Sequence, residues 1–303
     1  MKIFIKALYT FFIPIVLFLV FFLTAMVLIS KIVTSHSNQY DFDKNIEILF
    51  MGDSHITNTV IDSLIPEALN LSKRSEPYYY TFQKLKFLTK SSKINKLVLG
   101  YSYHNISGYY DEFINGHLST VMPHKLFFTL DLNEQLRVIN WNKRKILLLF
   151  KKIILSAYYQ YFENKSKKLD YWFFDGYDNP FRESKVNLNS LEKRIKFQFY
   201  LNQKVINFAD LNIHYFKKIT SYCKERDIDL YLLETPLHKE YLNRVPSSFK
   251  SKLLEISSKE NLQVINLENL NLSDSSFVPD GDHVSAKGSI ITTNKLLEIL
   301  KEK

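Results

Sequence analysis

The sequence predicts an α/β fold of three layers, in which helices cover both faces of a doubly wound parallel sheet. The first observation is a series of short apolar runs of strand length, found at residues 46–51, 66–71, 96–100, 229–234 and 262–267. The second is that helical segments separate these runs. The third is that the connections are short, which favours right-handed crossovers and therefore parallel strands.

The helical segments between the apolar runs are amphipathic. Residues 76–89, 208–226 and 249–259 place apolar side chains at the spacing of one helix face, as expected for helices that cover a sheet. Residues 111–205 do not follow the alternation of strand and helix. We therefore expect a helical insertion there, after which the α/β pattern resumes.

The N-terminal segment is strongly apolar. Residues 7–30 contain no charged side chain, and a helix of about 20 apolar residues is enough to cross a bilayer. A cleaved signal peptide is the alternative, but its apolar core would be shorter and would be followed by a small-residue cleavage site. Lys2 and Lys6 favour a cytoplasmic N-terminus. We predict a transmembrane anchor at 1–31, a tether at 32–44, and a domain at 45–303 on the outer face of the cytoplasmic membrane.

The composition limits the classes of partner. The chain of 303 residues has a formal net charge of +9, which suits nucleic acid, an anionic surface or an acidic polymer. The lysines are scattered along predicted helices and no nucleic-acid-binding motif is present, so we predict no nucleic-acid partner. Cys223 is the single cysteine, which excludes an intrachain disulfide.

Two stretches of the insertion allow two interpretations each. Residues 141–155 combine apolar and basic side chains, as in a helix packed on the core or in a basic helix lying on anionic lipid. The width of the apolar face favours the core. The aromatic segment 171–177 is either a carbohydrate-binding surface or a loop tucked into the core.

Two polar motifs stand where such a fold keeps its active site. The strand at 46–51 ends in Gly-Asp-Ser, which places Ser54 at the carboxyl edge of the sheet. Before the last helix, Asp280 and His283 are spaced to hydrogen-bond, so that the carboxylate fixes the imidazole tautomer. A surface turn, or half of a metal site, is the alternative. No further cluster of ligands is evident, so we predict no metal and no cofactor. Asp282 is expected to be exposed or to contact substrate.

These motifs resemble the first and last blocks of the SGNH (GDSL-type) hydrolase and acyltransferase superfamily, of which the chain would be a membrane-anchored member. The resemblance covers about 45–110 and 206–303 and implies a flavodoxin-like sheet. It also implies that Ser54 is the nucleophile, that His283 is the general base and then the general acid, and that Asp280 orients His283.

The resemblance further implies an oxyanion hole. Its donors would be the backbone N–H of Ser54, a backbone N–H near Ser75, and the side chain of Asn105. Ser75 stands where the family usually has glycine, and the gap from Gly100 to Asn105 is longer than the family pattern. His104 could replace Asn105 as donor, and Asn105 could instead be a turn or cap residue.

These features predict a serine-dependent esterase or O-acyltransferase that acts on an O-acyl group, in particular an O-acetyl group, of an exported or cell-surface glycan. A non-catalytic SGNH-like module that binds glycan or assists a membrane acyltransferase is the alternative. A third hypothesis is a structural protein held at the membrane surface by the basic helix. His55 and His238 either line the pocket or are structural, and neither is placed in the catalytic set.

Overall fold

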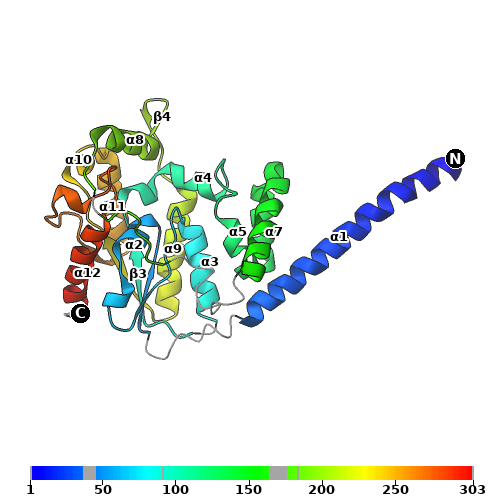
Figure 1. The fold of residues 1–303 in the computed structure, drawn as a ribbon, viewed down its shortest axis with the longest axis horizontal. Helices are drawn as coiled ribbons and strands as arrows, with labels where there is room; N and C mark the ends of the chain where they lie inside the picture. The colour runs from blue at the N-terminus through cyan, green and yellow to red at the C-terminus, as the bar shows by residue number, and fades with distance from the viewer. Residues whose placement is uncertain (1, 37–45, 91, 164–175, 183, 302–303) are drawn as a thin grey trace.

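The computed structural model of this chain describes residues 2–36, 46–90, 92–163, 176–182 and 184–301 (Figure 1). Most of the aromatic segment at 171–177 lies outside these residues, as does most of the predicted tether. Within them the fold is mixed α/β, with a five-stranded parallel sheet surrounded by many helices.

The strands run in the order β2-β1-β3-β6-β7, and every neighbouring pair is parallel. Their bounds are β1 Ile48–Met51, β2 Ala68–Asn70, β3 Lys96–Gly100, β6 Asp229–Glu234 and β7 Gln263–Asn266. Counted along the sheet, this is the doubly wound order 2-1-3-4-5. The prediction of a parallel sheet built from these five runs is therefore confirmed.

Alternate side chains of the strands face two separate cores. Leu49, Leu97 and Leu232 point to one face, which is covered by α3 (Tyr78–Leu88), α9 (Asp210–Glu225) and α11 (Ser247–Lys259). Phe50 and Val98 point to the other face, which is covered by α2 (Ser54–Thr59) and α12 (Ala286–Lys301). Successive strand residues alternate between faces, so each apolar run is buried on both sides.

The strand order reverses between β1 and β3, because the chain goes from β1 outward to β2 and returns to β3 on the other side. Open α/β sheets hold their ligands in the crevice beyond the carboxyl ends of the strands at this switch point. Ser54 follows β1 directly and lies at this edge.

Residues 111–205 contain helices and one element that the sequence did not predict. The helices are α4 Asp111–Ile114, α5 Pro123–Leu126, α6 Leu132–Trp141, α7 Ile146–Glu163 and α8 Leu188–Phe199. A short antiparallel hairpin, β4 Tyr200–Leu201 with β5 Lys204–Val205, follows α8.

Helix α7 packs into the core on one face only. Leu149 and Ile153 are buried in the main core, whereas Leu147 is 83% exposed and Ile154 is 54% exposed. The interpretation of 141–155 as a core helix therefore describes one face of α7, and its other face is apolar and open to solvent.

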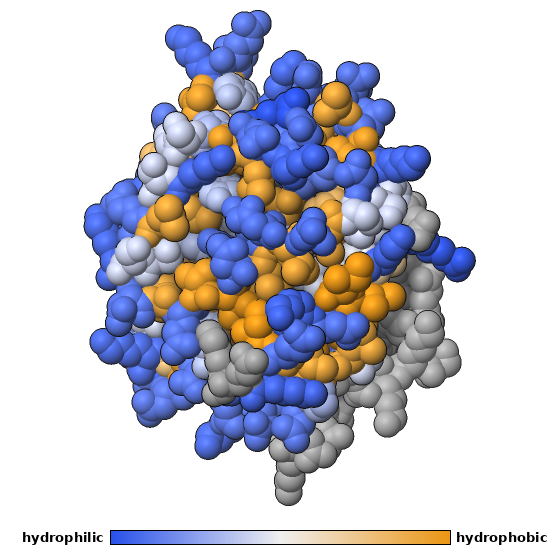
Figure 2. Space-filling view, turned by 90° about the vertical axis from the view of Figure 1, so that its left-hand side faces the viewer, coloured by the Kyte–Doolittle hydropathy of each residue, from blue (hydrophilic) through white to orange (hydrophobic). Residues whose placement is uncertain are grey.

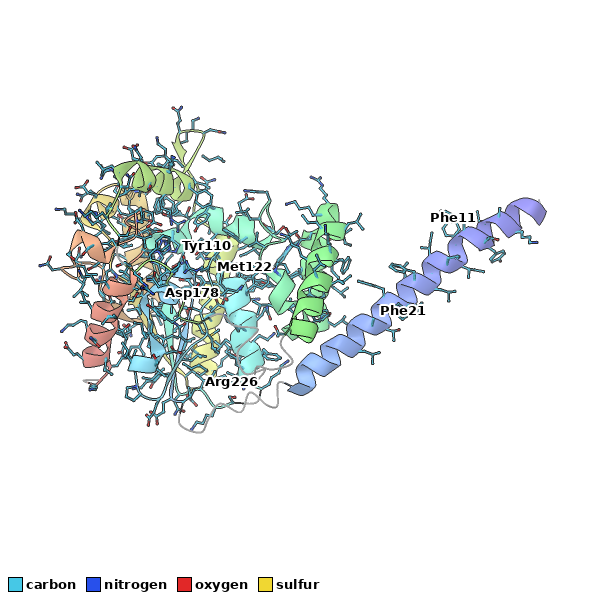
Figure 3. All side chains as sticks on the ribbon, in the orientation of Figure 1. Phe11, Phe21, Tyr110, Met122, Asp178 and Arg226 are labelled. Atoms are coloured by element: carbon cyan, nitrogen blue, oxygen red, sulfur yellow. The ribbon has the colours of Figure 1, made fainter. Side chains whose placement is uncertain are left out.

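Helix α1 (Lys2–His36) projects away from the α/β domain (Figure 1). Phe11 and Phe21 extend outward from it (Figure 3), and both are more than half exposed. Phe22 meets Phe150 of α7 with ring centroids 4.8 Å apart. A search of the described residues found no helix with both the length and the apolar character that a membrane span requires.

The face formed around α8, α10 (Lys239–Leu242), α11 and α12 is mostly hydrophilic, with hydrophobic side chains showing between the polar ones (Figure 2). The exposed apolar residues of α12 include Ile290 and Ile291. The polar surface fits helices that bury one stripe and present the other to water.

Candidate active site

The turn after β1 is shaped by two glycines. Gly52 has φ +144°, and a Cβ there would lie 3.0 Å from Ile56 Cγ1 and 3.2 Å from the Gly100 backbone. A Cβ on Gly100 would lie only 2.7 Å from the same Ile56 atom. The ends of β1 and β3 can therefore approach closely, and α2 begins at Ser54 without a spacer.

The structure brings the three predicted catalytic residues together, although the chain separates Ser54 from His283 by 229 positions. His283 Nε2 lies 2.8 Å from Ser54 Oγ, and His283 Nδ1 lies 2.9 Å from Asp280 Oδ2. Ser54 is half-buried and His283 is 9% exposed, so the hydroxyl is accessible while the imidazole is shielded. These contacts form a continuous hydrogen-bonded chain from hydroxyl to carboxylate.

The loop before α12 fixes Asp280 in turn. Its Oδ1 accepts hydrogen bonds from the backbone N–H groups of Asp282 at 2.9 Å and His283 at 3.2 Å. Burial opposes ionisation of Asp280, but the charge and hydrogen bond of His283 outweigh it and lower the pKa of the carboxyl. Asp280 is therefore a carboxylate, as it must be to stabilise an imidazolium.

The two other predicted oxyanion residues lie on loops at the same edge of the sheet. Ser75, between β2 and α3, has φ +60°, the left-handed conformation that glycine adopts most readily. The serine thus holds a backbone conformation that a glycine at this position would adopt without strain. Asn105 Oδ1 accepts the Ser102 N–H at 2.8 Å, and its Nδ2 donates to Asp53 Oδ2 at 2.7 Å. Asn105 therefore does act as a cap residue, here of the short 3-10 helix η3 (Tyr103–Ile106), and its role toward an oxyanion stays a prediction.

Asp53, which precedes the nucleophile, is the hub of a buried network that the sequence analysis missed. Its Oδ1 accepts the His55 N–H at 3.0 Å and caps α2. Its Oδ2 accepts hydrogen bonds from His104 Nε2 at 2.6 Å, from Asn105, and from the Tyr110 hydroxyl. Burial would raise the pKa of Asp53, but His104 and the other partners hold it well below its usual range. His104 is thereby directed to Asp53 and not to Ser54.

A second carboxylate–histidine pair lies beside the first. His55 Nε2 is 3.0 Å from Asp282 Oδ1, and His55 Nδ1 is 2.9 Å from Thr235 Oγ1. Asp282 is completely buried, so the expectation that it is exposed was wrong. The reason is that its Oδ2 also accepts hydrogen bonds from Arg194 Nε at 2.7 Å and Gln198 Nε2 at 2.8 Å.

The surroundings of this second pair favour its ionised form. Burial opposes the charge of Asp282, but His55 and Arg194 hold the pKa of the carboxyl well below its usual range. Burial also opposes the charge of His55, yet Asp282 outweighs it and raises the pKa of the imidazole. The rings of His55 and His283 are 4.9 Å apart between centroids, so this ion pair packs directly against the first pair.

The fold also brings His55 next to two adjacent residues, Asp282 and His283, so that three side chains able to ligate a metal lie together. Ligand atoms of His55, Asp282 and His283 lie within 4.8 Å of one another. Both ring nitrogens of each histidine already have protein partners, and Arg194 supplies a cation to Asp282. The arrangement fits a hydrogen-bonded ion cluster better than a cation site.

His238 has a structural role. It caps α10, where its Nδ1 accepts the Glu240 N–H at 3.2 Å, and its Nε2 lies 3.2 Å from Asp274. Both ring nitrogens are thus engaged away from Ser54.

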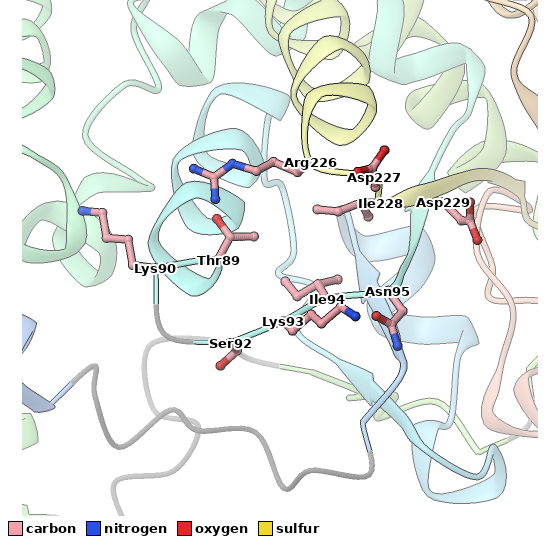
Figure 4. A pocket seen from close by; sticks show the side chains of 10 residues that line it. All are labelled: Thr89, Lys90, Ser92, Lys93, Ile94, Asn95, Arg226, Asp227, Ile228 and Asp229. Atoms are coloured by element: carbon pink, nitrogen blue, oxygen red, sulfur yellow. The ribbon is translucent and has the colours of Figure 1, made fainter.

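A pocket of about 740 Å³ opens at the opposite, amino edge of the sheet (Figure 4). It is lined by Thr89, Lys90, Ser92, Lys93, Ile94, Asn95, Arg226, Asp227, Ile228 and Asp229. These residues lie before β3 and before or at the first residue of β6, whereas the Ser54 network follows β1 and β3. This pocket is therefore separate from the candidate active site.

Among solved structures, several chains resemble this one, whereas sequence comparisons gave no match. No family model matches the chain, and no curated protein matches it. A solved structure provisionally described as a platelet activating factor from Streptococcus pneumonia aligns with a TM-score of 0.37 and 11% identity, over 94% of this chain and 98% of that one. At this level the similarity carries no argument about the site, which rests on the geometry above.

Proposed function

We propose that this protein is a serine-dependent esterase or O-acyltransferase of the SGNH type. The observation that carries the proposal is the hydrogen-bonded chain Ser54–His283–Asp280 at the carboxyl edge of the sheet. A nucleophile in contact with a base, which a third group orients, is the arrangement that acyl transfer requires.

The reaction begins when Ser54 Oγ attacks the ester carbonyl and His283 Nε2 accepts its proton. Asp280 stabilises the imidazolium that results. The tetrahedral intermediate collapses when His283 returns the proton to the leaving alcohol, which leaves an acyl group on Ser54. Water or a second hydroxyl, deprotonated by His283, then attacks the acyl enzyme.

The oxyanion needs hydrogen-bond donors close to Ser54 Oγ. The backbone N–H groups of Ser54 and Ser75 are our candidates, together with the amide hydrogen of Asn105 that Asp53 does not use. The left-handed backbone of Ser75 supports its inclusion, since this is a conformation that glycine adopts most readily and the family usually has glycine here.

The substrate we propose is an O-acyl, in particular O-acetyl, group on an exported or cell-surface glycan. The placement of the domain at the outer face of the membrane, with residues 1–31 as anchor, stays a prediction. The engagement of Asn105 by Asp53 favours one further candidate function, a non-catalytic SGNH-like module that binds glycan or assists a membrane acyltransferase.

The test uses the full chain in detergent and compares wild type with Ser54→Ala, His283→Ala and the control Ser63→Ala. Ser63 is an exposed serine in the short 3-10 helix η2 (Asp62–Leu64). Each is assayed for hydrolysis of a chromogenic acetyl ester and for labelling by a fluorophosphonate. We expect both signals in wild type and in Ser63→Ala, no labelling in Ser54→Ala, and a loss of hydrolysis of at least about a thousandfold in both site variants. Folded wild type that is neither labelled nor active would favour the non-catalytic module.

A further inference from the structure

Arg194 is the one residue of helix α8 whose charged group reaches the loop that carries Asp280 and His283. Its Nε donates to Asp282 Oδ2 at 2.7 Å, and the same oxygen lies 4.0 Å from His283 Nδ1. Gln198, one turn further along α8, binds that oxygen as well. The guanidinium is therefore held next to the candidate catalytic histidine.

Only part of this guanidinium is used. Among the described residues no hydrogen bond involves Arg194 Nη1 or Nη2, and 22% of the side chain is exposed. With Nε held by Asp282, the terminal nitrogens Nη1 and Nη2 are the donors of this guanidinium that remain for a ligand. Such a pair of donors matches the two oxygens of a carboxylate or phosphate.

The cation is permanent at this position. Burial disfavours its charge, but Asp282, with Tyr109 and Asp280 as further neighbours, raises the pKa of Arg194 above its usual value. Preorganisation favours binding, because the side chain loses little further rotamer freedom when it takes a ligand. The net charge of +9 adds a field that attracts anionic molecules.

We propose that Arg194 binds an anionic group of the substrate, a carboxylate or phosphate carried by the acylated sugar. This inference rests on the proposed function and narrows its substrate class to acidic glycans. Helix α8, a part of the insertion, would then select the substrate, while the residues of the sheet edge carry out the chemistry.

The competing explanation is that Arg194 only neutralises Asp282 and so positions the loop. A positioning role would affect neutral and acidic ligands equally. Selection of an anion would affect acidic ligands alone. The effect of an Arg194 substitution on acidic ligands, divided by its effect on neutral ligands, therefore distinguishes the two explanations.

The experiment measures how fast a fluorophosphonate labels Ser54 in the full chain while a sugar competes. The competitors are methyl glucoside, methyl glucuronide and glucose 6-phosphate, and the proteins are wild type, Arg194→Gln, Arg194→Lys and Lys193→Gln. Lys193 is an exposed neighbour on α8 and is the matched control for loss of one positive charge. The two acidic sugars distinguish a carboxylate site from a phosphate site.

We expect at least one acidic sugar to protect Ser54 at concentrations where methyl glucoside does not. Arg194→Gln should weaken that protection about tenfold, the value of one charge-assisted hydrogen bond. Arg194→Lys should retain part of it, and Lys193→Gln should match wild type. Equal protection by neutral and acidic sugars, or an unchanged ratio in Arg194→Gln, would overturn the inference and leave the serine chemistry intact.

Failure of labelling in wild type would instead count against the proposed function. In that case binding of the same three sugars to the same proteins is measured by saturation-transfer NMR, which needs no reactive serine. A preference for the acidic sugars that Arg194→Gln removes supports the anion site, and its absence rejects the site.

Discussion

The two carboxylate–histidine pairs of this protein use the same residue types in different surroundings. Asp280 is half-buried, and the imidazole of His283, although only 9% exposed, reaches the hydroxyl of the half-buried Ser54. Asp282 and His55 lie behind them, where the carboxylate is completely buried and binds Arg194 and Gln198 as well. The first pair contacts the candidate nucleophile Ser54. The side chains of the second pair hydrogen-bond to residues to which no part in the acyl transfer is assigned.

This difference shows that the surroundings of a carboxylate–histidine pair, and not its residue types, distinguish a candidate catalytic pair from a structural one. A buried ion pair contributes little net stability, but the loss of one partner leaves an unpaired charge and is costly. Changes in the first pair should therefore reduce turnover, and changes in the second pair should reduce stability.

The largest expected effect is that of Asp280→Asn on turnover. The amide keeps an oxygen for the backbone N–H groups of Asp282 and His283 but cannot stabilise an imidazolium. We expect kcat for a chromogenic acetyl ester to fall by about 10³ to 10⁴. The midpoint of urea unfolding should stay close to that of wild type. If Asp280→Asn instead lost much stability and little kcat, the pair of Asp280 and His283 would be structural and the assignment of the two pairs would be wrong.

The companion change, Asp282→Asn, should act mainly on stability. It leaves His55 and Arg194 with no carboxylate in a buried site, so we expect a loss of about 3–5 kcal/mol in the free energy of unfolding. Urea unfolding followed by tryptophan fluorescence measures it. If the folded Asp282→Asn protein lost as much kcat as Asp280→Asn, the second pair would belong to the catalytic machinery.

The pH dependence of stability sharpens the comparison further. The pKa of His55 is raised in the folded state, so its charged form adds stability that is fully present below its unfolded value of 6.5. This contribution is lost as the pH rises through the higher, folded value. His55→Gln should therefore lower Tm most near pH 6 and progressively less above 6.5. A Tm difference that grows with pH would contradict an ionised Asp282–His55 pair.

The smallest expected effect is that of Ser75→Gly, which lies outside both pairs. It shows how far activity and stability shift when neither pair is changed. Ser75 has φ +60°, so Ser75→Gly relieves backbone strain but adds freedom to the unfolded chain. These terms nearly cancel, and we expect a change in stability within about 1 kcal/mol. Activity should persist, because the backbone N–H is retained. Loss of activity with unchanged folding would show that the Ser75 hydroxyl itself takes part.

The sequence predicted the parts of the fold that depend on local pattern. The strands β3 and β6 coincide with the predicted apolar runs, since the last four residues of each strand are buried and their interior residues are apolar or aromatic. The hairpin after α8 was missed because its four paired residues, two in each strand, carry no alternating pattern. Its turn requires Asn202 and Gln203 to adopt positive φ. Glycine at these positions would have indicated such a turn in the sequence, but neither residue is glycine.

Only those residues of the site that belong to a local sequence motif could be predicted. Ser54, Asp280 and His283 stand in recognisable local contexts at the end of a strand and before a helix. The burial of Asp282 depends on Arg194, which is 88 positions away in a stretch without strand–helix alternation. No local pattern reveals such a partner. The polar residues His104 and Asn105, which follow β3, were the available signal for the Asp53 network.

The contact between the first and last helices of the α/β domain has a consequence for biosynthesis. The Ser289 and Thr293 hydroxyls of α12 donate to the backbone carbonyls of Asn58 and Thr59 at the end of the nucleophile's helix. During translation Ser54 emerges more than 200 residues before its base His283 and the helix α12 that steadies it. A nascent chain that has not yet reached α12 would therefore hold a hydroxyl without its base, so the proposed reaction could begin only after these residues have been made.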